Sequence, residues 1–228
     1  MSCAAQPSLV PSHIAARKPT KPLRYPTMSV KLPPSTFWTW FRGFANRLPK
    51  HDIPEELQDE LLSHLHCFDN RLYFLLSTNR TAHELIITVE GNADAISSAD
   101  ELVGAAPRIA NWKFLSLKPP MGFAFTHRDG RISLDVSTLW FLPTNSTDVP
   151  PKFGVIIGLP NVDFVLATQS VDTAYTILET GIGERSCIKD IHRVTVDNLP
   201  ADPKAYGFIP LTRLAEYIAF YNRRHQIE

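Results

Sequence analysis

The spacing of hydrophobic residues divides the chain after about residue 35 into helical and extended segments. Apolar side chains recur every three or four residues over about 36–48, 53–68, 93–105 and 170–180, and again after Pro210, which predicts amphipathic helices. Apolar and polar positions alternate, or apolar runs are short, over 72–77, 84–90, 111–117, 138–142, 153–159 and 191–196, which predicts strands.

Two helix ends have specific signals. Asp52 and Glu55 form a D-x-x-E capping box with Pro54 in the first turn, so the second helix is expected to begin at Asp52. Gly181, followed by the apolar Ile182, is expected to end the helix over 170–180 as its C′ residue.

A hairpin is predicted at Asp129-Gly130, a dipeptide that tolerates the positive φ angles of a type I′ turn. A two-residue loop there pairs Arg128 with Arg131. The same register places Phe125 opposite Leu134, Phe123 opposite Val136, Ala124 opposite Asp135 and Thr126 opposite Ser133. One face of the hairpin is then apolar, which agrees with the turn chemistry.

These elements predict an α+β fold. We expect a single domain over residues 35–228, with a largely antiparallel sheet of about seven strands and helices packed mainly on one face. Two pseudo-duplicated α+β lobes are the alternative. In either arrangement the aromatic stripe Phe37-Trp38-x-Trp40-Phe41 is expected to pack on the sheet, and a stacking platform for bases or sugars is the less favoured interpretation.

Residues 1–34 are expected to be a disordered basic tail, because they contain seven prolines and show no hydrophobic periodicity. A transit peptide and a translation start at Met28 are the alternatives to a plain tail. The segment lacks the apolar region of a secretory signal.

Charge is divided unevenly along a chain whose 23 basic and 23 acidic residues balance. Eight of the basic residues precede Asp52, the first acidic one, so 15 basic and 23 acidic residues follow position 51. An acidic body repels nucleic-acid backbones, and DNA or RNA binding is therefore expected only through the basic tail.

The three cysteines, Cys3, Cys67 and Cys187, are widely spaced and odd in number, which favours a reducing compartment over a disulfide framework. The longest apolar runs are far shorter than the 18 or so residues that a membrane span needs. We therefore expect a cytoplasmic protein without a membrane partner.

Several short motifs together resemble a widespread family of uncharacterised bacterial proteins. They are FWxWF at 37–41, ELIITxEG at 84–91, NWKF at 111–114, KPxxGF at 118–123 and WFxP at 140–143, and the resemblance spans about residues 35–222. It supports a bacterial, cytoplasmic protein. It implies no activity, because the family has no established one.

No motif identifies a catalytic or metal site. His64 and His66 point to different sides of a helix, so only Glu60, His64 and Cys67 share a face, and no metal and no cofactor are expected. Cys187 and His192 lack the surroundings of a nucleophile and its base, and the glycines at 181 and 183 follow a helix rather than a strand, unlike a phosphate loop.

Six polar residues at strand ends, in the hairpin or in loops are the candidate binding residues: Glu90, Lys113, Lys118, His127, Asp135 and Glu184. Solvent-facing alternation on an antiparallel sheet is the competing explanation for each of them. As function we expect a non-enzymatic interaction protein of the immunity or adaptor type, which binds another, basic protein through its acidic surface. The alternative is an enzyme or small-ligand binder with a pocket between sheet and loops.

Overall fold

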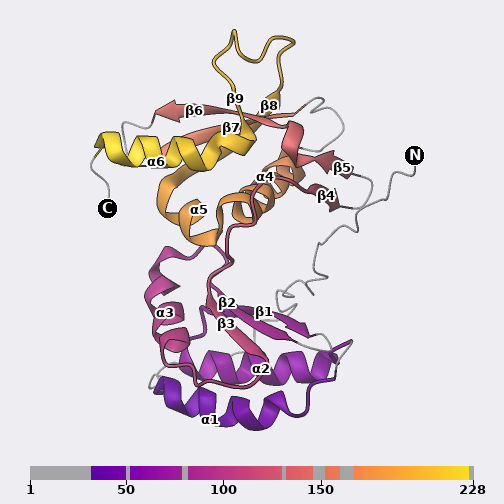
Figure 1. Ribbon diagram of the computed structural model, residues 1–228, viewed down its shortest axis with the longest axis vertical. Coiled ribbons are helices and arrows are strands. Elements are labelled where there is room, and N and C mark those ends of the chain that lie inside the picture. Colours follow the sequence, from indigo (N-terminus) through magenta and orange to yellow (C-terminus); the bar gives the residue numbers. More distant parts are fainter. Residues whose placement is uncertain are drawn as a thin grey trace, which may run out of the picture. The chain divides into compact units, whose positions relative to one another are not determined.

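A computed structural model describes residues 32–49, 52–78, 82–129, 132–145, 152–159 and 167–225. The predicted tail over 1–34 lies outside these ranges except for its last three residues, and Pro34 is already the first residue of a helix. The chain divides into two compact units, residues 1–117 and 118–228. Each unit has its own helices and sheet (Figure 1).

The first unit contains three helices and a three-stranded sheet in its described part. The elements are α1 (Pro34–Ala45), α2 (Glu55–Phe68), β1 (Tyr73–Thr78), β2 (His83–Thr88), a 3-10 turn (Ala93–Ala95), α3 (Ile96–Gly104) and β3 (Trp112–Ser116). Strand β2 is central, antiparallel to β1 and parallel to β3. The parallel pair requires a crossover, which α3 supplies.

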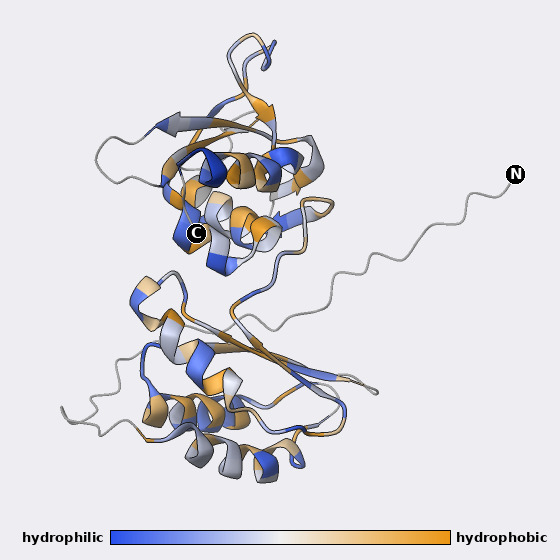
Figure 2. Cartoon of the chain, turned by 60° about the vertical axis from the view of Figure 1, so that its left-hand side comes forward, coloured by the Kyte–Doolittle hydropathy of each residue, from blue (hydrophilic) through white to orange (hydrophobic). Residues whose placement is uncertain are grey.

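Aromatic rings join α1 to the sheet of this unit. Phe41 is fully buried, and its ring meets those of Trp112 and Phe114 on β3 edge to face, at centroid distances of 5.0 and 5.6 Å. Trp38 Nε1 donates a 2.7 Å hydrogen bond to the Leu102 carbonyl, one of the last carbonyls of α3. The FWxWF stripe is therefore part of the core, and the strands of this unit show both hydrophobic and hydrophilic colours (Figure 2).

The second unit contains a hairpin, a four-stranded sheet and three helices in its described part. They are β4 (Thr126–Asp129), β5 (Ile132–Asp135), a 3-10 turn (Val136–Thr138), β6 (Trp140–Asn145), β7 (Phe153–Leu159), α4 (Ala167–Ile182), α5 (Glu184–Asp190), β8 (Ile191–Asn198), β9 (Ile209–Pro210), a 3-10 turn (Leu211–Arg213) and α6 (Leu214–His225). The sheet order is β8-β7-β6-β9, with β7 parallel to β8 and β6 antiparallel to its neighbours.

The three helices of this unit lie on one face of the four-stranded sheet (Figure 1). That face of β7 carries Phe153, Val155 and Ile157, which form one core with Ile177 of α4 and Ile218 of α6. The other face of β7 carries Gly154 and Gly158. A Cβ on Gly158 would lie 2.6 Å from the Leu199 side chain, so the segment that begins at Leu199 packs on this face.

The expected single sheet of about seven strands is wrong. The described residues form three sheets of three, two and four strands, and two of the strand pairs are parallel. Hydrophobic alternation locates a strand but not its partner, because the partner depends on how the crossover helix folds back. Both units nevertheless contain the order strand, antiparallel strand, helix, parallel strand, which agrees with the alternative of two pseudo-duplicated lobes, although that alternative specified no element order.

Two predicted helix ends are also wrong. Helix α2 begins at Glu55 with Pro54 as its N-cap, and Asp52 takes a positive φ of 49° instead of capping the helix. Helix α4 continues through Gly181 to Ile182, and Gly183, at φ 83°, is the residue that leaves the helix. A Cβ on Gly181 would lie 2.0 Å from the Phe123 ring, so packing rather than backbone conformation requires this glycine.

The predicted hairpin exists, but its register is displaced by two residues. Asp129 pairs with Ile132, and Thr126 pairs with Asp135. Residues 130 and 131 of the expected turn lie outside the described ranges. The Asp135 carboxylate accepts hydrogen bonds from the backbone and hydroxyl of Ser137, which ends the strand in a 3-10 turn. A shift of two preserves alternation, and Phe123, Phe125, Leu134 and Val136 all pack in or against one core as expected. The face is not wholly apolar, because His127 lies opposite Leu134.

Candidate functional site

Lys118 and Glu184 are the predicted site residues that the structure brings together, and their contacts hold the second unit together. The Glu184 side chain is fully buried and accepts a 3.1 Å hydrogen bond from the Lys118 backbone. The Glu184 backbone donates a 3.0 Å bond to the Lys118 carbonyl in return. Lys118 Nζ forms a 3.1 Å ion pair with Glu179 of α4. These contacts, here called the bracket between Lys118 and Glu184, hold the first residue of the second unit against α4 and α5. The two residues therefore have a structural role.

Cys187 lies on α5 one turn after Glu184 and is buried. Burial, with the negative charges of Glu179 and Glu184 nearby, raises the pKa of its thiol to about 12. The thiolate is therefore scarce at neutral pH, which opposes a nucleophilic role. His192, considered as its base, is exposed on β8.

Glu90 lies in the turn after β2 and lines a cleft of about 440 Å³ in the first unit. Glu90 and Gly91 both have positive φ angles, 48° and 84°, and the Asn92 backbone donates to the Val89 carbonyl across the turn. A positive φ at a non-glycine residue other than Asn or Asp is strained. The Glu90 carboxylate accepts a 3.1 Å hydrogen bond from the Thr88 hydroxyl, which holds it in place.

Arg71 is the one cationic residue among those that line this cleft. Its guanidinium donates to both carboxylate oxygens of Asp69, at 2.9 and 2.6 Å, and to the Asp94 carbonyl at 3.3 Å. These hydrogen bonds hold the pKa of the Asp69 carboxyl well below its usual range. The cleft thus combines Glu90 with an arginine that is already paired, and Asn70, Tyr73, Val89 and Asn92 complete the lining.

The three other predicted residues lie apart from these groups. Lys113 is exposed on β3 and pairs with Glu84 on β2 at 3.0 Å. His127 lies on β4, where burial lowers its pKa although Asp129 acts in the opposite direction. Its Nε2 is buried and has no hydrogen-bond partner within the described ranges. Asp135, as described above, ends β5.

The suspected metal residues have other contacts. His64 stacks on Trp40 at a centroid distance of 3.8 Å, and His66 is hydrogen-bonded to the Leu72 carbonyl at 3.1 Å. Cys67 is exposed. Among the residues with described positions, no three His, Cys, Asp or Glu side chains come close enough to hold an ion.

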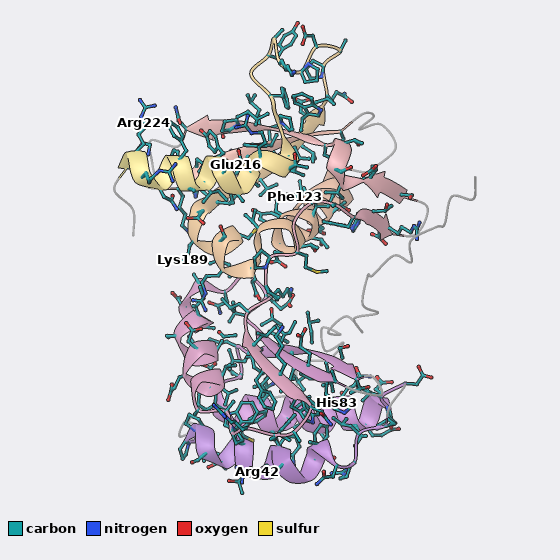
Figure 3. All side chains as sticks on the ribbon, viewed as in Figure 1. Arg42, His83, Phe123, Lys189, Glu216 and Arg224 are labelled. Carbon is teal, nitrogen blue, oxygen red and sulfur yellow. The ribbon has the colours of Figure 1, made fainter. Side chains whose placement is uncertain are left out.

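A surface on α6 was missed by sequence reasoning. It is a groove of about 390 Å³, here called the α6 groove, and its lining is Ile209, Arg213, Glu216, Tyr217, Phe220 and Arg223. Phe220 is 49% exposed, whereas Ile218 and Tyr221, its neighbours on the helix, are buried. Figure 3 labels Glu216 and Arg224 on the same helix.

The lining of the α6 groove contains two arginines and one glutamate, a net charge of one positive unit, and the basic residues Arg224 and His225 follow it on the helix. Arg213 Nε donates to Glu216 at 3.0 Å, so these two side chains neutralise each other in part. Arg223, Arg224 and His225 then form the basic last turn of the helix. The available signal was Phe220 itself, an aromatic residue on the side of the helix opposite Leu214 and Ile218.

In the part of the chain that the structure covers, no helix combines the length and hydrophobicity needed to span a bilayer. A scan against protein-family models finds no match for this chain, and searches of curated proteins and of solved structures find no match either. The resemblance to the bacterial family therefore stays a prediction.

Proposed function

We propose that this protein is a non-enzymatic, cytoplasmic interaction module that binds a segment of another protein in the α6 groove. The observation that carries the proposal is the half-exposed Phe220 beside the partly buried Tyr217, in a groove whose lining includes Arg213 and Arg223. Exposed aromatic and arginine side chains contribute most to protein recognition. The partner segment would then be acidic with an apolar side chain in its centre.

The length of the α6 groove suits a short segment. Arg213 and Arg223 are ten residues apart along helical chain, which corresponds to about 15 Å at 1.5 Å per residue. A partner helix of about ten residues, or four to five extended residues, matches that length. The basic last turn of α6 also offsets the helix dipole, so part of its charge has a structural explanation.

The acidic surface expected from the sequence would make a second contact, with a basic region of the same partner. Residues 52–117 contain 11 acidic and four basic residues, whereas residues 118–228 contain 12 and 11. The excess thus lies in residues 52–117, where Asp52, Glu56 and Asp59 are exposed around the start of α2. The first unit as a whole has no acidic excess, because eight basic residues precede Asp52. Electrostatic attraction of this kind increases association rates more than affinity.

The alternative, a small-ligand binder, has its best support in the cleft beside Glu90. A strained residue with an ionisable side chain in a polar cleft is a common feature of binding sites. Arg71, however, is already engaged by Asp69, so the cleft offers less uncommitted positive charge than the α6 groove.

A designed peptide tests the proposal for α6. The probe is a fluorescent amphipathic peptide with glutamates around a central leucine, compared with the same peptide carrying lysines. We expect the acidic peptide to bind the full chain with an affinity that falls as salt rises, and the lysine peptide to bind at least about tenfold more weakly. Arg223→Glu and Phe220→Ala should each weaken binding of the acidic peptide.

Tyr206→Ala is the matched control, because Tyr206 is 69% exposed in the second unit but does not line the groove. Equal binding of both peptides, or equal effects of the groove variants and the control, would overturn the proposal.

A further inference from the structure

The outer edge of β8 is an open end of the four-stranded sheet. Within the described ranges β8 pairs with β7 alone, and it is the last strand in the sheet order. A register shift between Phe153 and Gly154 leaves His192 as a bulge, so the regular part of the strand runs from Arg193 onward. Backbone donors and acceptors along such an edge can pair with another strand.

The chemistry of this strand is complementary to itself around Thr195. Arg193 and Asp197, two residues on either side, lie on the face opposite the helices, because they pair with Gly154 and Gly158 of β7. Val194 and Val196 lie on the helix-covered face, where both contact the core. Residues 193–197 are therefore basic, apolar, polar, apolar and acidic in that order, with Thr195 in the middle.

An antiparallel copy of the same strand matches this pattern at every position. With Thr195 opposite Thr195 of the second copy, Arg193 faces Asp197 of that copy, and Val194 faces its Val196. Opposite charges and β-branched residues are both favourable cross-strand pairs. Each pair occurs twice, because the arrangement has two-fold symmetry.

We propose that two copies of this chain associate through β8, with Thr195 on the two-fold axis, so that their four-stranded sheets form one continuous sheet. Helix α4 packs against β8, so a two-fold axis normal to the sheet places the α4 helices of both copies on the same face of the joined sheet. The proposal is independent of the α6 groove, which lies beside β9 at the other end of the sheet.

Edge charges have a competing explanation, because charged residues on an edge strand also prevent pairing between molecules. That explanation predicts a monomer. Self-pairing predicts a dimer whose stability requires opposite charges at positions 193 and 197, whichever position carries the positive one. Charge reversal separates the two.

The first experiment is sedimentation velocity on the full chain over a range of concentrations. We expect a monomer–dimer equilibrium whose dissociation constant rises at least about tenfold in Arg193→Asp and in Asp197→Arg, since both changes create like-charge pairs. The double variant, R193D with D197R, should restore dimerisation. Lys204→Asp, an exposed charge in the segment between β8 and β9, is the control that should leave it unchanged.

The second experiment tests the register by cysteine cross-linking, in a background with Cys3→Ser and Cys67→Ser; Cys187 is buried and is retained. Directly opposed residues in antiparallel strands have Cα atoms about 4.5–5.5 Å apart, which suits a disulfide. Thr195→Cys should cross-link to itself under mild oxidation, and Asp197→Cys should not. A chain that stays monomeric, a double variant that fails to restore dimerisation, or equal cross-linking at both positions would overturn the proposal.

Discussion

At the scale of single residues, the structure assigns most of the predicted site residues to structural tasks. Glu184 is buried and holds the Lys118 backbone, Lys113 forms a surface ion pair, and Asp135 ends a strand. Sequence patterns marked these positions because polar residues at strand ends bind ligands and also form turns and caps. The distinction depends on neighbours that are distant in sequence. Lys118 and Glu184 are 66 positions apart.

Asp69 gives a prediction about pH at this scale. Its carboxylate, held by Arg71, has a lowered pKa, so the native state favours the ionised form more than the unfolded chain does. This contribution to the free energy of unfolding is fully present above about pH 4, the ordinary range for Asp, and is lost as pH falls further. We expect Asp69→Asn to destabilise the protein by about 1 kcal/mol at pH 7, a modest effect because Arg71 is 43% exposed and water screens the pair.

The measurement is urea unfolding of both proteins at pH 7 and pH 3. The difference between them should shrink at pH 3. A difference that is the same at both pH values would show that the Asp69 carboxylate is not the source of the effect.

At the scale of elements, local patterns predicted the presence of a helix or strand better than they predicted where it ends or which strand pairs with it. Strands β1, β2, β3, β7 and β8 lie where alternation or short apolar runs placed them, within two residues at each end. Helix α4 is longer than expected, and α5 was not predicted, because Gly181 was expected to end the helix. Gly181 lies inside the helix, where glycine is otherwise unfavourable. The Phe123 ring explains it, because the ring leaves no room for a Cβ at this position.

The glycines of α4 and α1 provide a prediction with a matched control. Gly181→Ala forces a Cβ into the Phe123 ring, which Figure 3 labels beside α4, and we expect it to lower the free energy of unfolding by about 1–3 kcal/mol. Gly43→Ala on α1 meets no atom within 4 Å and should instead raise it by about 0.5–1 kcal/mol through helix propensity. Denaturant unfolding of the two variants checks both signs, and a stabilising Gly181→Ala would contradict the packing described here.

At the scale of the whole molecule, charge is the property that the sequence reports most directly. The four basic residues Arg17, Lys18, Lys21 and Arg24 lie before Met28, and the acidic excess lies in residues 52–117. A zero net charge therefore conceals two oppositely charged parts of the chain. Attraction to nucleic acid depends on the local basic part, because phosphate contacts are screened over about 8–10 Å in ordinary buffers.

Deletion of residues 1–27 tests this division. We expect any retention of the full chain on a DNA column to fall steeply as the salt concentration rises. We expect the shortened chain not to be retained at low salt. Retention of the shortened chain at the same salt would place a nucleic-acid site in the remainder and contradict the expectation drawn from its acidic charge.

The sequence by itself determined the α+β class, the places of most strands and helices, the largely apolar face of the hairpin and the burial of the FWxWF stripe. These follow from hydrophobic periodicity, which acts over a few residues and can be read locally. Tertiary structure alone decided the division into three sheets, the parallel pairs, the hairpin register, the bracket between Lys118 and Glu184, and the exposure of Phe220. Each of these depends on which distant residues come into contact, and pairing of that kind is set by packing of the whole chain rather than by local pattern.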